Sequence, residues 1–496
     1  MMKTNILFLL LMVMISSCAV NKRSASTKKF ALQQVQKDYD LFRNIIETSH
    51  PGLYWYTAKD SMDYYFTKGR TMLQDSMTES HFRMALSYVV SKLGCGHTSV
   101  RPSKKFTRSG DSLRNRQFPL AFKIWKDTAL VTFNLNSQDS IIRRGSVVTA
   151  IDGRPMPEIV DSLFQFLSTD GYNRTHKYQT LSNRGTFGAL YLSVFGYRQK
   201  FNVNFIDSTG KAAMADISIY PPLPDTTEAH AGTELPEVQR VPRRKRKRWQ
   251  LFSARNMSFD TSLSTAFMSL NTFQKSGKLR RFFKTAFKKS ESLKIKNLVI
   301  DLRTNGGGNV TNSNLLTRYI ADQPFKIADS LYTRNRSNRY SRYQQNRLGN
   351  WLFALFLTRK QADGHYHFGY YERKHFKPKR KNHFNGQVYV LSGGNTFSAS
   401  TLFIKSVMRQ KNVTVVGEET GGGAYGNNAW LIPTVTLPVT KVRFRLPLYR
   451  LVIDKDEAKG FGVQPGVEAP PTTEAIRKNF DFKMNKAVEL IRSDRQ

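Results

Sequence analysis

The stretch VYVLSGGNTFSASTLFIKSVMRQ, residues 388–410, joins a short apolar run to a segment with helical periodicity. The run at 388–392 is typical of a strand covered on both faces, because such strands are apolar at every position and end at glycines. The segment after Ser398 has the spacing of a helix with one apolar side. Ser398 therefore stands at a turn from strand to helix, and the fold and the function both depend on that junction.

Two other apolar runs have the same design. KNLVIDLRTNGGGNV, residues 296–310, and VTVVGEETGGG, residues 413–423, each end in a glycine-rich turn. Strands that alternate with helices predict an α/β fold with a mainly parallel sheet and crossover connections. Ligands bind beyond the carboxyl ends of such strands. The spacing thus predicts an α/β core over residues 256–472 with its site at these three turns.

A serine at this kind of turn suits nucleophilic catalysis. The first N–H groups of a helix carry partial positive charge, which stabilises an oxyanion formed when a hydroxyl attacks a carbonyl. The sequence around Ser398 is NTFSAS rather than GxSxG, which disfavours an α/β-hydrolase. Three successive glycines, 306–308, leave backbone N–H groups free and allow close approach of a ligand. The alternative is that Ser398 only caps the following helix.

Residues 30–112 are predicted to form an N-terminal helical domain. The first helix should stop before Pro51, and a third should start at Thr78 or Ser80 as its cap. This unit ends in GCGHTSV, residues 94–100, where small residues leave the ring of His97 approachable. His97 is the candidate general base, and the alternative is a histidine with a purely structural role.

Residues 113–220 change to a β-rich pattern and resemble a PDZ domain. A strand at 147–151, a tight turn at Asp152–Gly153 and a helix through Ile159 and Leu163 are predicted. PDZ units capture an extended peptide by adding it to a sheet edge, whereas a generic module would hold no ligand. A Pro-rich linker without helical periodicity is expected at 221–255, and a single C-terminal helix at 473–496.

The N-terminus has the features of an export signal. Lys3 precedes the apolar run 6–15, which is too short to span a bilayer, and small residues precede Cys18. This pattern resembles a bacterial lipoprotein signal at 1–18, followed by a flexible tether at 19–29. The chain is then expected in the cell envelope, held to a lipid membrane through Cys18. The alternative is an ordinary signal peptide.

The composition limits the classes of partner. A formal charge of +40 comes from basic residues that are mostly scattered, which favours a general basic background over nucleic-acid binding. The run PRRKRKRW at 242–249 is the exception, and either a solvated tether or a phosphate-binding or lipid-binding patch accounts for it. No HExxH motif accompanies the four histidines between 365 and 383, so neither a metal nor an organic cofactor is expected. Subunit assembly is not predicted.

Six motifs in order resemble the serine peptidases of the C-terminal processing and tricorn core protease family. They span most of the chain after the signal and read HPGLYWY, CGHTSV, RRGSVVTAIDG, VIDLRTNGGG, TFSAS with VVGEETGGG, and GFGVQPGV. The resemblance implies a ClpP/crotonase-like core and a peptidase activity. It also implies Ser398 as the nucleophile.

The resemblance favours the tricorn-like branch, in which a histidine is the base. The processing branch places a lysine in the glycine loop, where this chain has Gly423. His97 is retained, although Gly96 stands where tricorn-type enzymes have a serine. The resemblance further implies Glu457 as the carboxylate that supports the base, and Gly307 and Ala399 as oxyanion-hole donors.

The predicted function is therefore a serine endopeptidase or carboxy-terminal processing protease that hydrolyses envelope proteins or peptides through a Ser398 acyl-enzyme. The alternative is a catalytically inactive peptide-binding lipoprotein of the same fold.

Overall fold

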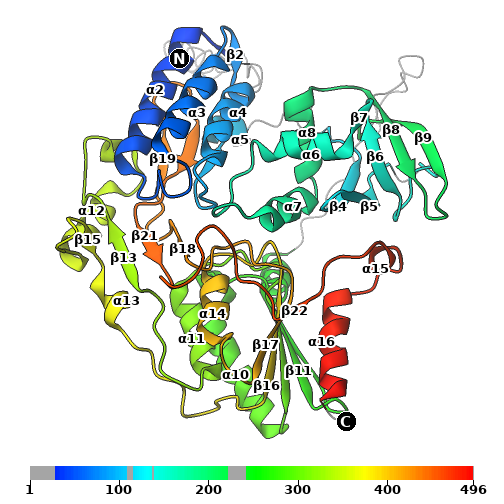
Figure 1. Cartoon of the computed structure of the whole chain (residues 1–496), viewed down its shortest axis with the longest axis vertical. Helices are drawn as coiled ribbons and strands as arrows, with labels where there is room; N and C mark the ends of the chain where they lie inside the picture. The colour runs from blue at the N-terminus through cyan, green and yellow to red at the C-terminus, as the bar shows by residue number, and fades with distance from the viewer. Residues whose placement is uncertain (1–27, 109–115, 137–138, 222–241, 495–496) are drawn as a thin grey trace, which may run out of the picture.

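The computed structural model describes residues 28–108, 116–136, 139–221 and 242–494. Figure 1 shows a helical unit and a β-rich domain side by side above a larger α/β core, which is formed by the C-terminal half of the chain. The predicted signal segment, with Cys18, lies outside the described residues.

The core is built on a six-stranded sheet in the order β10-β11-β12-β16-β17-β22. Only the β10–β11 pair is antiparallel, so the predicted mainly parallel α/β sheet is confirmed. Its strands are β10 Arg255–Asp260, β11 Thr265–Leu270, β12 Asn297–Asp301, β16 Gln387–Ser392, β17 Val413–Gly417 and β22 Val467–Glu468. Its crossover helices are α10 Leu279–Ser292, α11 Val310–Ile320 and α14 Ala399–Val407.

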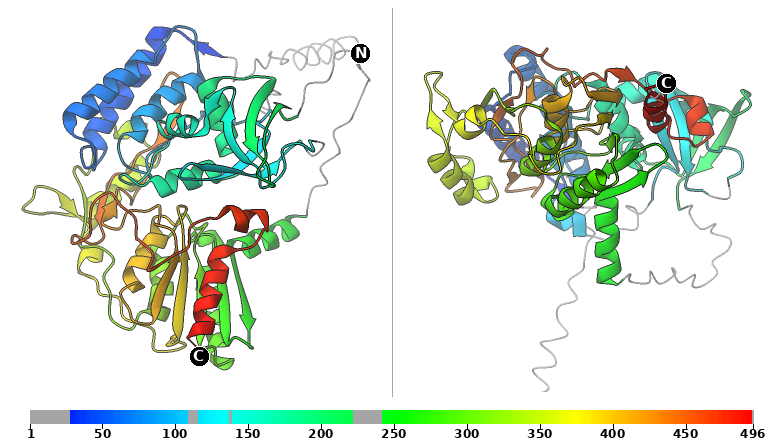
Figure 2. Two further views of the ribbon diagram at one scale, coloured as in Figure 1. Left: turned by 45° about the vertical axis from the view of Figure 1, so that its right-hand side comes forward. Right: turned by 90° about the horizontal axis from the view of Figure 1, so that it is seen from below.

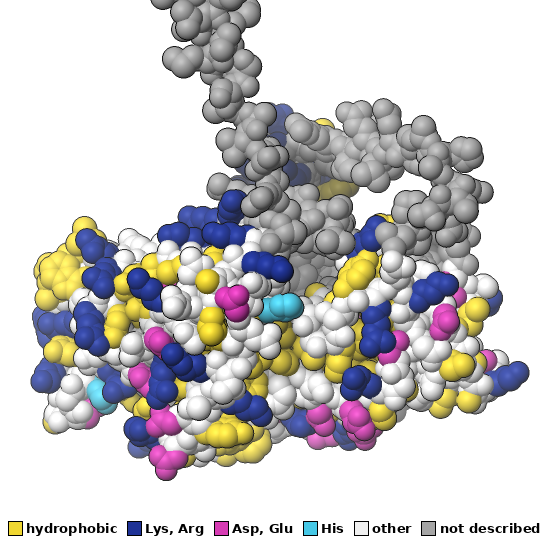
Figure 3. Space-filling model, turned by 90° about the horizontal axis from the view of Figure 1, so that it is seen from above, with side chains coloured by type: hydrophobic (Ala, Val, Ile, Leu, Met, Phe, Trp, Pro, Cys, Tyr) yellow, Lys and Arg dark blue, Asp and Glu magenta, His cyan; other side chains and the backbone are white. Residues whose placement is uncertain are grey.

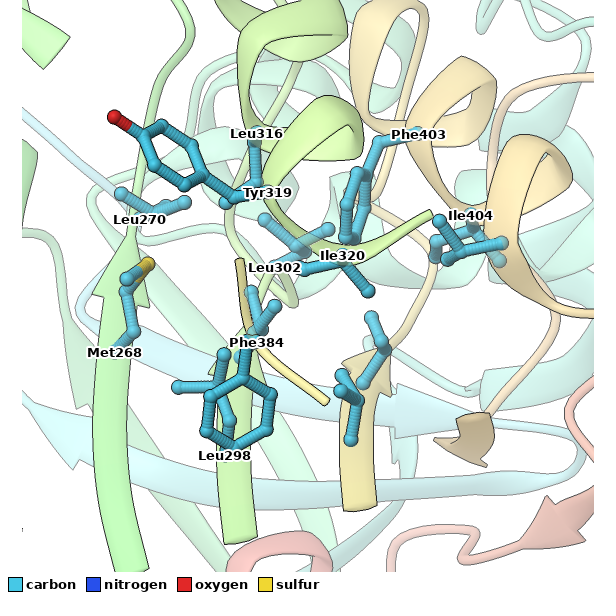
Figure 4. Packing of buried hydrophobic residues seen from close by; sticks show 14 of the residues in the cluster. Met268, Leu270, Leu298, Leu302, Leu316, Tyr319, Ile320, Phe384, Phe403 and Ile404 are labelled. Carbon is cyan, nitrogen blue, oxygen red and sulfur yellow. The ribbon is translucent and has the colours of Figure 1, made fainter. Parts of the chain in front are cut away.

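Alternate residues of the central strands face two different layers, because side chains along a strand point to opposite sides. Leu298 and Ile300 pack under helices α10, α11 and α14, with Phe403 fully buried among them (Figure 4). Val299 faces the other side, where the C-terminal helix α16 (Phe482–Ser493) covers the sheet with Ile491. Both faces are therefore apolar, as the continuous apolar runs predicted.

The helical unit contains α2 Leu32–Ser49, α3 Lys59–Thr71 and α4 Glu79–Ser91. The first helix ends before Pro51, and Thr78 accepts a hydrogen bond from the His81 N–H as the cap of α4, so both predictions are confirmed. The unit shares its core with a hairpin from the far end of the chain, β19 Thr434–Thr436 and β20 Arg443–Arg445, which pairs with β3 Ser99–Arg101. The buried carboxylate of Asp38 accepts hydrogen bonds from this hairpin.

The β-rich domain has five strands in the order β4-β5-β6-β8-β9, and β7 pairs with β6. Their bounds are β4 Leu120–Trp125, β5 Thr128–Asn134, β6 Val147–Ile151, β7 Arg154–Pro155, β8 Lys200–Ile206 and β9 Ala212–Ser218. The predicted strand at 147–151 is confirmed, as is the tight turn, where Asp152 and Gly153 both have positive φ. Helices α6 Met156–Phe164, α7 Arg174–Ser182 and α8 Thr186–Phe195 complete the domain. At the β4 edge the Ile124 N–H donates to Ser182 Oγ at 2.8 Å, so adding a peptide strand there requires α7 to move.

A second sheet in the core has the order β14-β15-β13-β21-β18 and lies beside the first. Its strands are β13 Ser330–Thr333, β14 Arg359–Lys360, β15 Tyr366–His367, β18 Gly426–Asn427 and β21 Arg450–Val452. Helices α12 Arg347–Leu357 and α13 Gly369–Arg373 connect them. The small elements β1 Lys29–Phe30, β2 Met77–Thr78, α5 Lys104–Arg108, η2 Lys275–Gly277 and η3 Ser341–Tyr343 lie elsewhere along the chain.

Two predictions of secondary structure are wrong. Residues 243–254 of the expected linker form a helix, α9 Arg243–Ala254, because arginine, lysine, leucine and glutamine are good helix formers even without an apolar stripe. The expected single C-terminal helix is two helices, α15 Thr473–Arg477 and α16, because Asp481 caps a new start through the Met484 N–H. Among the described helices none is long and apolar enough to cross a bilayer.

Candidate active site

The candidate site lies where three turns meet at the carboxyl edge of the core sheet. Parallel strands β12, β16 and β17 end together, so the turns that follow them are neighbours. The turn after β16 is tied to the turn after β12 by the Phe397 N–H, which donates to the Asn305 carbonyl at 3.1 Å. It is tied to the turn after β17 by the Gly422 N–H, which donates to the Thr396 carbonyl at 3.2 Å. Backbone hydrogen bonds thus fix the position of Ser398.

Ser398 has a strained backbone. Its φ of 55° and ψ of −119° lie in a region that L-residues seldom occupy, which costs about 1–3 kcal/mol. Its side chain makes no capping hydrogen bond to α14, so the interpretation of Ser398 as a simple helix cap is wrong. Ser398 is instead among the residues that line two clefts.

Gly307 allows the glycine turn to pack closely against the turn at Ser398. Its φ is +91°, and a Cβ added there would lie 2.8 Å from the Ser398 Cβ and 2.9 Å from the Ala399 nitrogen. Only glycine allows this approach. The three-glycine turn after β12 is therefore packed directly against the serine turn, as predicted for a site with backbone donors.

His97 lines the same cleft as Ser398, and the two come from opposite ends of the chain. The cleft has a volume of about 750 Å³ and is also lined by the glycine turn 306–308. The His97 side chain is only 7% exposed, and its ring lies 4.9 Å from the ring of Phe397. Neither ring nitrogen has a hydrogen-bond partner among the described residues, which leaves both available to a substrate or to Ser398.

The carboxylate beside His97 is Asp170, not Glu457. Asp170 Oδ1 lies 3.8 Å from His97 Nδ1, and the side chain is 1% exposed. The same carboxylate accepts hydrogen bonds from the Gly96 N–H at 2.8 Å and from the Gly423 N–H at 3.4 Å. It therefore holds the histidine turn and the glycine loop after β17 together, and it carries negative charge into a buried site.

Glu457 has a different place. It pairs with Lys405 of α14 and, at 3.1 Å, with Arg409, which follows that helix. The expectation that Glu457 supports His97 is wrong for this structure, because these two cations hold the Glu457 carboxylate whereas Asp170 lies beside His97. Asp170 was missed because it lies in the β-rich domain, where no chemistry was expected.

The loop that carries Asp170 is fixed by contacts to every part of the site. The Gly171 N–H donates to the Gly94 carbonyl at 2.9 Å, and Asn173 Nδ2 donates to the Thr420 carbonyl at 2.7 Å. Asn173 also caps α7 through the His176 N–H. The available signal was the polar run TDGYN ahead of a helix with an asparagine cap, which marks an ordered loop but not a catalytic one.

His176 is a second histidine that sequence reasoning missed. It lines the cleft, and its Nδ1 lies 2.7 Å from the Gly394 carbonyl oxygen. A carbonyl only accepts, so Nδ1 carries the hydrogen and Nε2 carries a lone pair. Burial lowers the pKa of His176, which keeps the ring neutral at physiological pH. Its ring stacks on Phe397 at 4.9 Å, on the aromatic side chain that also contacts His97.

Steric crowding explains why residue 96 is a glycine rather than a serine. A Cβ at this position would lie 2.5 Å from the Phe397 ring and 3.3 Å from the Asp170 nitrogen, so a serine does not fit. The neighbouring Thr98 does not replace that serine. It is fully buried, and its hydroxyl lies 3.0 Å from His50 Nε2, facing away from the cleft.

The predicted oxyanion-hole donors differ in availability. The Ala399 N–H has no backbone acceptor among the described residues, as expected at the first position of a helix. The Gly307 N–H donates to Asn305 Oδ1 at 3.0 Å, so it serves an oxyanion only after Asn305 turns away. The adjacent Gly308 N–H has no acceptor among the described residues and lines the cleft.

The histidine-rich segment shows no metal site. His367 is held by Asp363 at 2.9 Å and by Glu372 at 2.7 Å. In the described part of the chain no group of three or more histidine, cysteine or acidic side chains is arranged to hold a metal ion.

The parallel core, its serine turn and its glycine turns define a serine-type peptidase. Residues 264–469, which make up most of the α/β core, match the family model of peptidase family S41. The fold as a whole is similar to mature CPAF complexed with lactacystin, with a TM-score of 0.64, 13% identity and coverage of 93% of this chain and 98% of that chain. A second structure of mature CPAF has a TM-score of 0.62 at 13% identity and covers 90% of this chain and 94% of that chain. No curated protein matches the sequence.

Proposed function

We propose that the chain hydrolyses peptide bonds through an acyl-enzyme on Ser398, with His97 as the general base and Asp170 as the carboxylate that orients it. One observation carries the proposal. The strained Ser398 and the buried His97 line one cleft, although they are far apart along the chain. Strain at a polar residue that makes no local hydrogen bond is typical of functional positions.

The proposed reaction gives each of these groups a defined role. His97 takes the Ser398 proton as the oxygen attacks the substrate carbonyl, and it returns that proton to the leaving amine. The Asp170 carboxylate stabilises the imidazolium that forms between these steps. The Ala399 N–H and a donor from the glycine turn hold the oxyanion. Water then attacks the acyl group and releases the second product.

The contacts of His97 are consistent with a site whose catalytic hydrogen bonds form only when substrate binds. Its distance of 3.8 Å to Asp170 exceeds a hydrogen bond, and Phe397 packs against its ring. Catalytic hydrogen bonds often tighten only in the substrate complex, so a long distance in the free enzyme does not exclude a catalytic pair. The same observations also favour the second candidate function, an inactive peptide-binding protein of this fold.

Labelling with a fluorophosphonate probe distinguishes the two candidates. The folded wild-type chain should react, while Ser398→Ala should not and His97→Ala should react far more slowly. Glu457→Gln is the matched control, since Glu457 is paired with cations outside the cleft, and it should label like the wild type. If the wild type and the variants all melt as folded proteins and the wild type still fails to label, the result supports the binding protein instead.

The proposed location is the cell envelope, with envelope proteins or peptides as substrates and Cys18 as a lipid attachment point. The support is the signal pattern at 1–18 alone. Mass spectrometry of the membrane-extracted protein tests this. A mature chain that starts at Cys18 and carries acyl mass agrees with the proposal, and a soluble chain cleaved elsewhere contradicts it.

A further inference from the structure

Helix α9 is a strongly cationic element with no role in the proposed catalysis. Its first six residues, 243–248, are all arginine or lysine, and none of the twelve residues of the helix is buried. None of these six cations is paired with a carboxylate among the residues that the structure describes. The right-hand view of Figure 2 shows the helix projecting from the body of the molecule. Six uncompensated charges on a projecting helix form a surface for an anionic partner.

Two large aromatic side chains follow the cations on the same helix. Trp249 is 62% exposed and Phe252 is 65% exposed. Residues three apart lie on one face of a helix, so the two rings project together. A cluster of lysine and arginine followed by exposed tryptophan and phenylalanine suits a membrane surface, with the cations at lipid phosphates and the rings at the level of the headgroups.

Exposed cations of helix α10 also lie near α9 and add to its positive charge. Helix α10 follows η2, which contacts α9, and it exposes Arg280, Arg281 and Lys284. Figure 3 shows lysine and arginine spread over the face seen from above, with fewer carboxylates between them. The exposed cations of α10 thus add to the positive charge near α9, which favours attraction to an anionic surface.

The end of α9 is attached to the rim of the candidate active site. The Asn271 N–H donates to the Ala254 carbonyl at 3.0 Å, and Asn271 Nδ2 donates to the Ser253 carbonyl at 2.6 Å. Asn271 itself lines the cleft that contains His97 and Ser398. A partner bound to α9 is thus held within about one helix length, about 18 Å, of the rim of the cleft.

We propose that α9 is a binding element for anionic phospholipid membranes, in which residues 243–248 contact lipid phosphates while Trp249 and Phe252 insert. A membrane is favoured over a nucleic-acid duplex because two neighbouring apolar rings gain little in a duplex groove, and the oligonucleotide test below decides between a membrane and a single strand. This surface is independent of lipid attachment at Cys18 and of the identity of the catalytic residues. It keeps the peptidase cleft close to the lipid surface.

The experiment measures sedimentation of the full chain with phosphatidylcholine vesicles that contain or lack phosphatidylglycerol. All variants keep the same residues 1–27, so any contribution of that segment is common to them. The α9 variant replaces four cations, Arg244→Gln, Lys245→Gln, Lys247→Gln and Arg248→Gln. The charge-matched control replaces four exposed cations of another segment, Lys374→Gln, Lys377→Gln, Arg380→Gln and Lys381→Gln.

The wild type should bind anionic vesicles more tightly than zwitterionic ones at physiological salt, because any binding through residues 1–27 is common to both kinds of vesicle. Each cation near an anionic surface contributes about fivefold in affinity, so the α9 variant should bind at least about a hundredfold more weakly, while the control should change far less. A double variant, Trp249→Ala with Phe252→Ala, should also bind more weakly at unchanged charge. Because every substituted residue of α9 is exposed, none of these changes should alter thermal unfolding.

Three results would overturn the proposal. Equal losses in the α9 variant and the charge-matched control would show that net charge alone acts. Binding that is unaffected by removal of the two aromatic side chains would exclude insertion. Tighter binding of a duplex or single-stranded oligonucleotide than of anionic vesicles, at the same salt concentration, would assign α9 to nucleic acid.

Discussion

Asp170→Asn is the sharpest test of the proposed site, because it removes one charge and almost no volume. During the reaction His97 becomes an imidazolium 3.8 Å from the Asp170 carboxylate, and both side chains are buried. Coulomb's law with an effective dielectric constant of about 20 gives about 4 kcal/mol for a pair at this distance. Loss of that attraction should lower kcat/KM by about a thousandfold, since about 1.4 kcal/mol corresponds to a factor of ten.

The assay is hydrolysis of a fluorogenic peptide, together with the rate of fluorophosphonate labelling. The asparagine oxygen can still accept from the Gly96 N–H, while only the longer hydrogen bond from the Gly423 N–H is lost, so the loop should keep its position and the melting temperature should fall slightly. Glu457→Gln is the control and should retain activity. The reasoning is refuted if Asp170→Asn is as active as the wild type, or if Glu457→Gln suffers the larger loss while both proteins remain folded.

Three further predictions concern the structure around the site. Gly96→Ser should destabilise the protein by about 1–3 kcal/mol in urea unfolding, because its Cβ would lie 2.5 Å from the Phe397 ring. Phe403→Ala should cost about 3–5 kcal/mol in the same measurement, because this ring is fully buried under the core sheet. Burial lowers the pKa of Lys123 to about 8 from 10.5. The unfolded chain binds the extra proton between these values, so the free energy of unfolding should rise from about pH 8 to about pH 10, and Lys123→Met should reduce that rise.

Each of these has a contrary outcome. A serine at position 96 that leaves stability unchanged would mean that the Phe397 ring moves aside at no cost. A loss below about 1 kcal/mol for Phe403→Ala would mean that the core collapses around the cavity. An identical pH dependence in Lys123→Met and the wild type would assign the rise to other groups.

Local sequence was sufficient for much of the fold. The strands before the three glycine turns, the helix that ends before Pro51 and the strand at 147–151 follow from apolar periodicity and from the punctuation of glycine and proline. Local rules failed at α9 and at the break before α16. Helix propensity alone produced α9, where no apolar pattern was present. A single aspartate cap started α16, where the apolar pattern had suggested one continuous helix.

Some residues of the candidate site could likewise be predicted from local sequence, and others could not. Ser398 and the glycine turn were evident from the chain because both lie at strand ends, where a parallel sheet gathers its functional groups. His97 was evident from its small neighbours. Asp170, His176 and the engaged N–H of Gly307 were not, because their relevance comes from contacts between segments far apart along the chain.

The sequence by itself determined the parallel core, the strand-to-helix turn at Ser398 and the candidate base, since each depends on neighbours within a few residues. Only the tertiary structure decided which carboxylate serves that base. Charge acts through space, and the folded chain holds Glu457 against Lys405 and Arg409 while it buries Asp170 beside the imidazole.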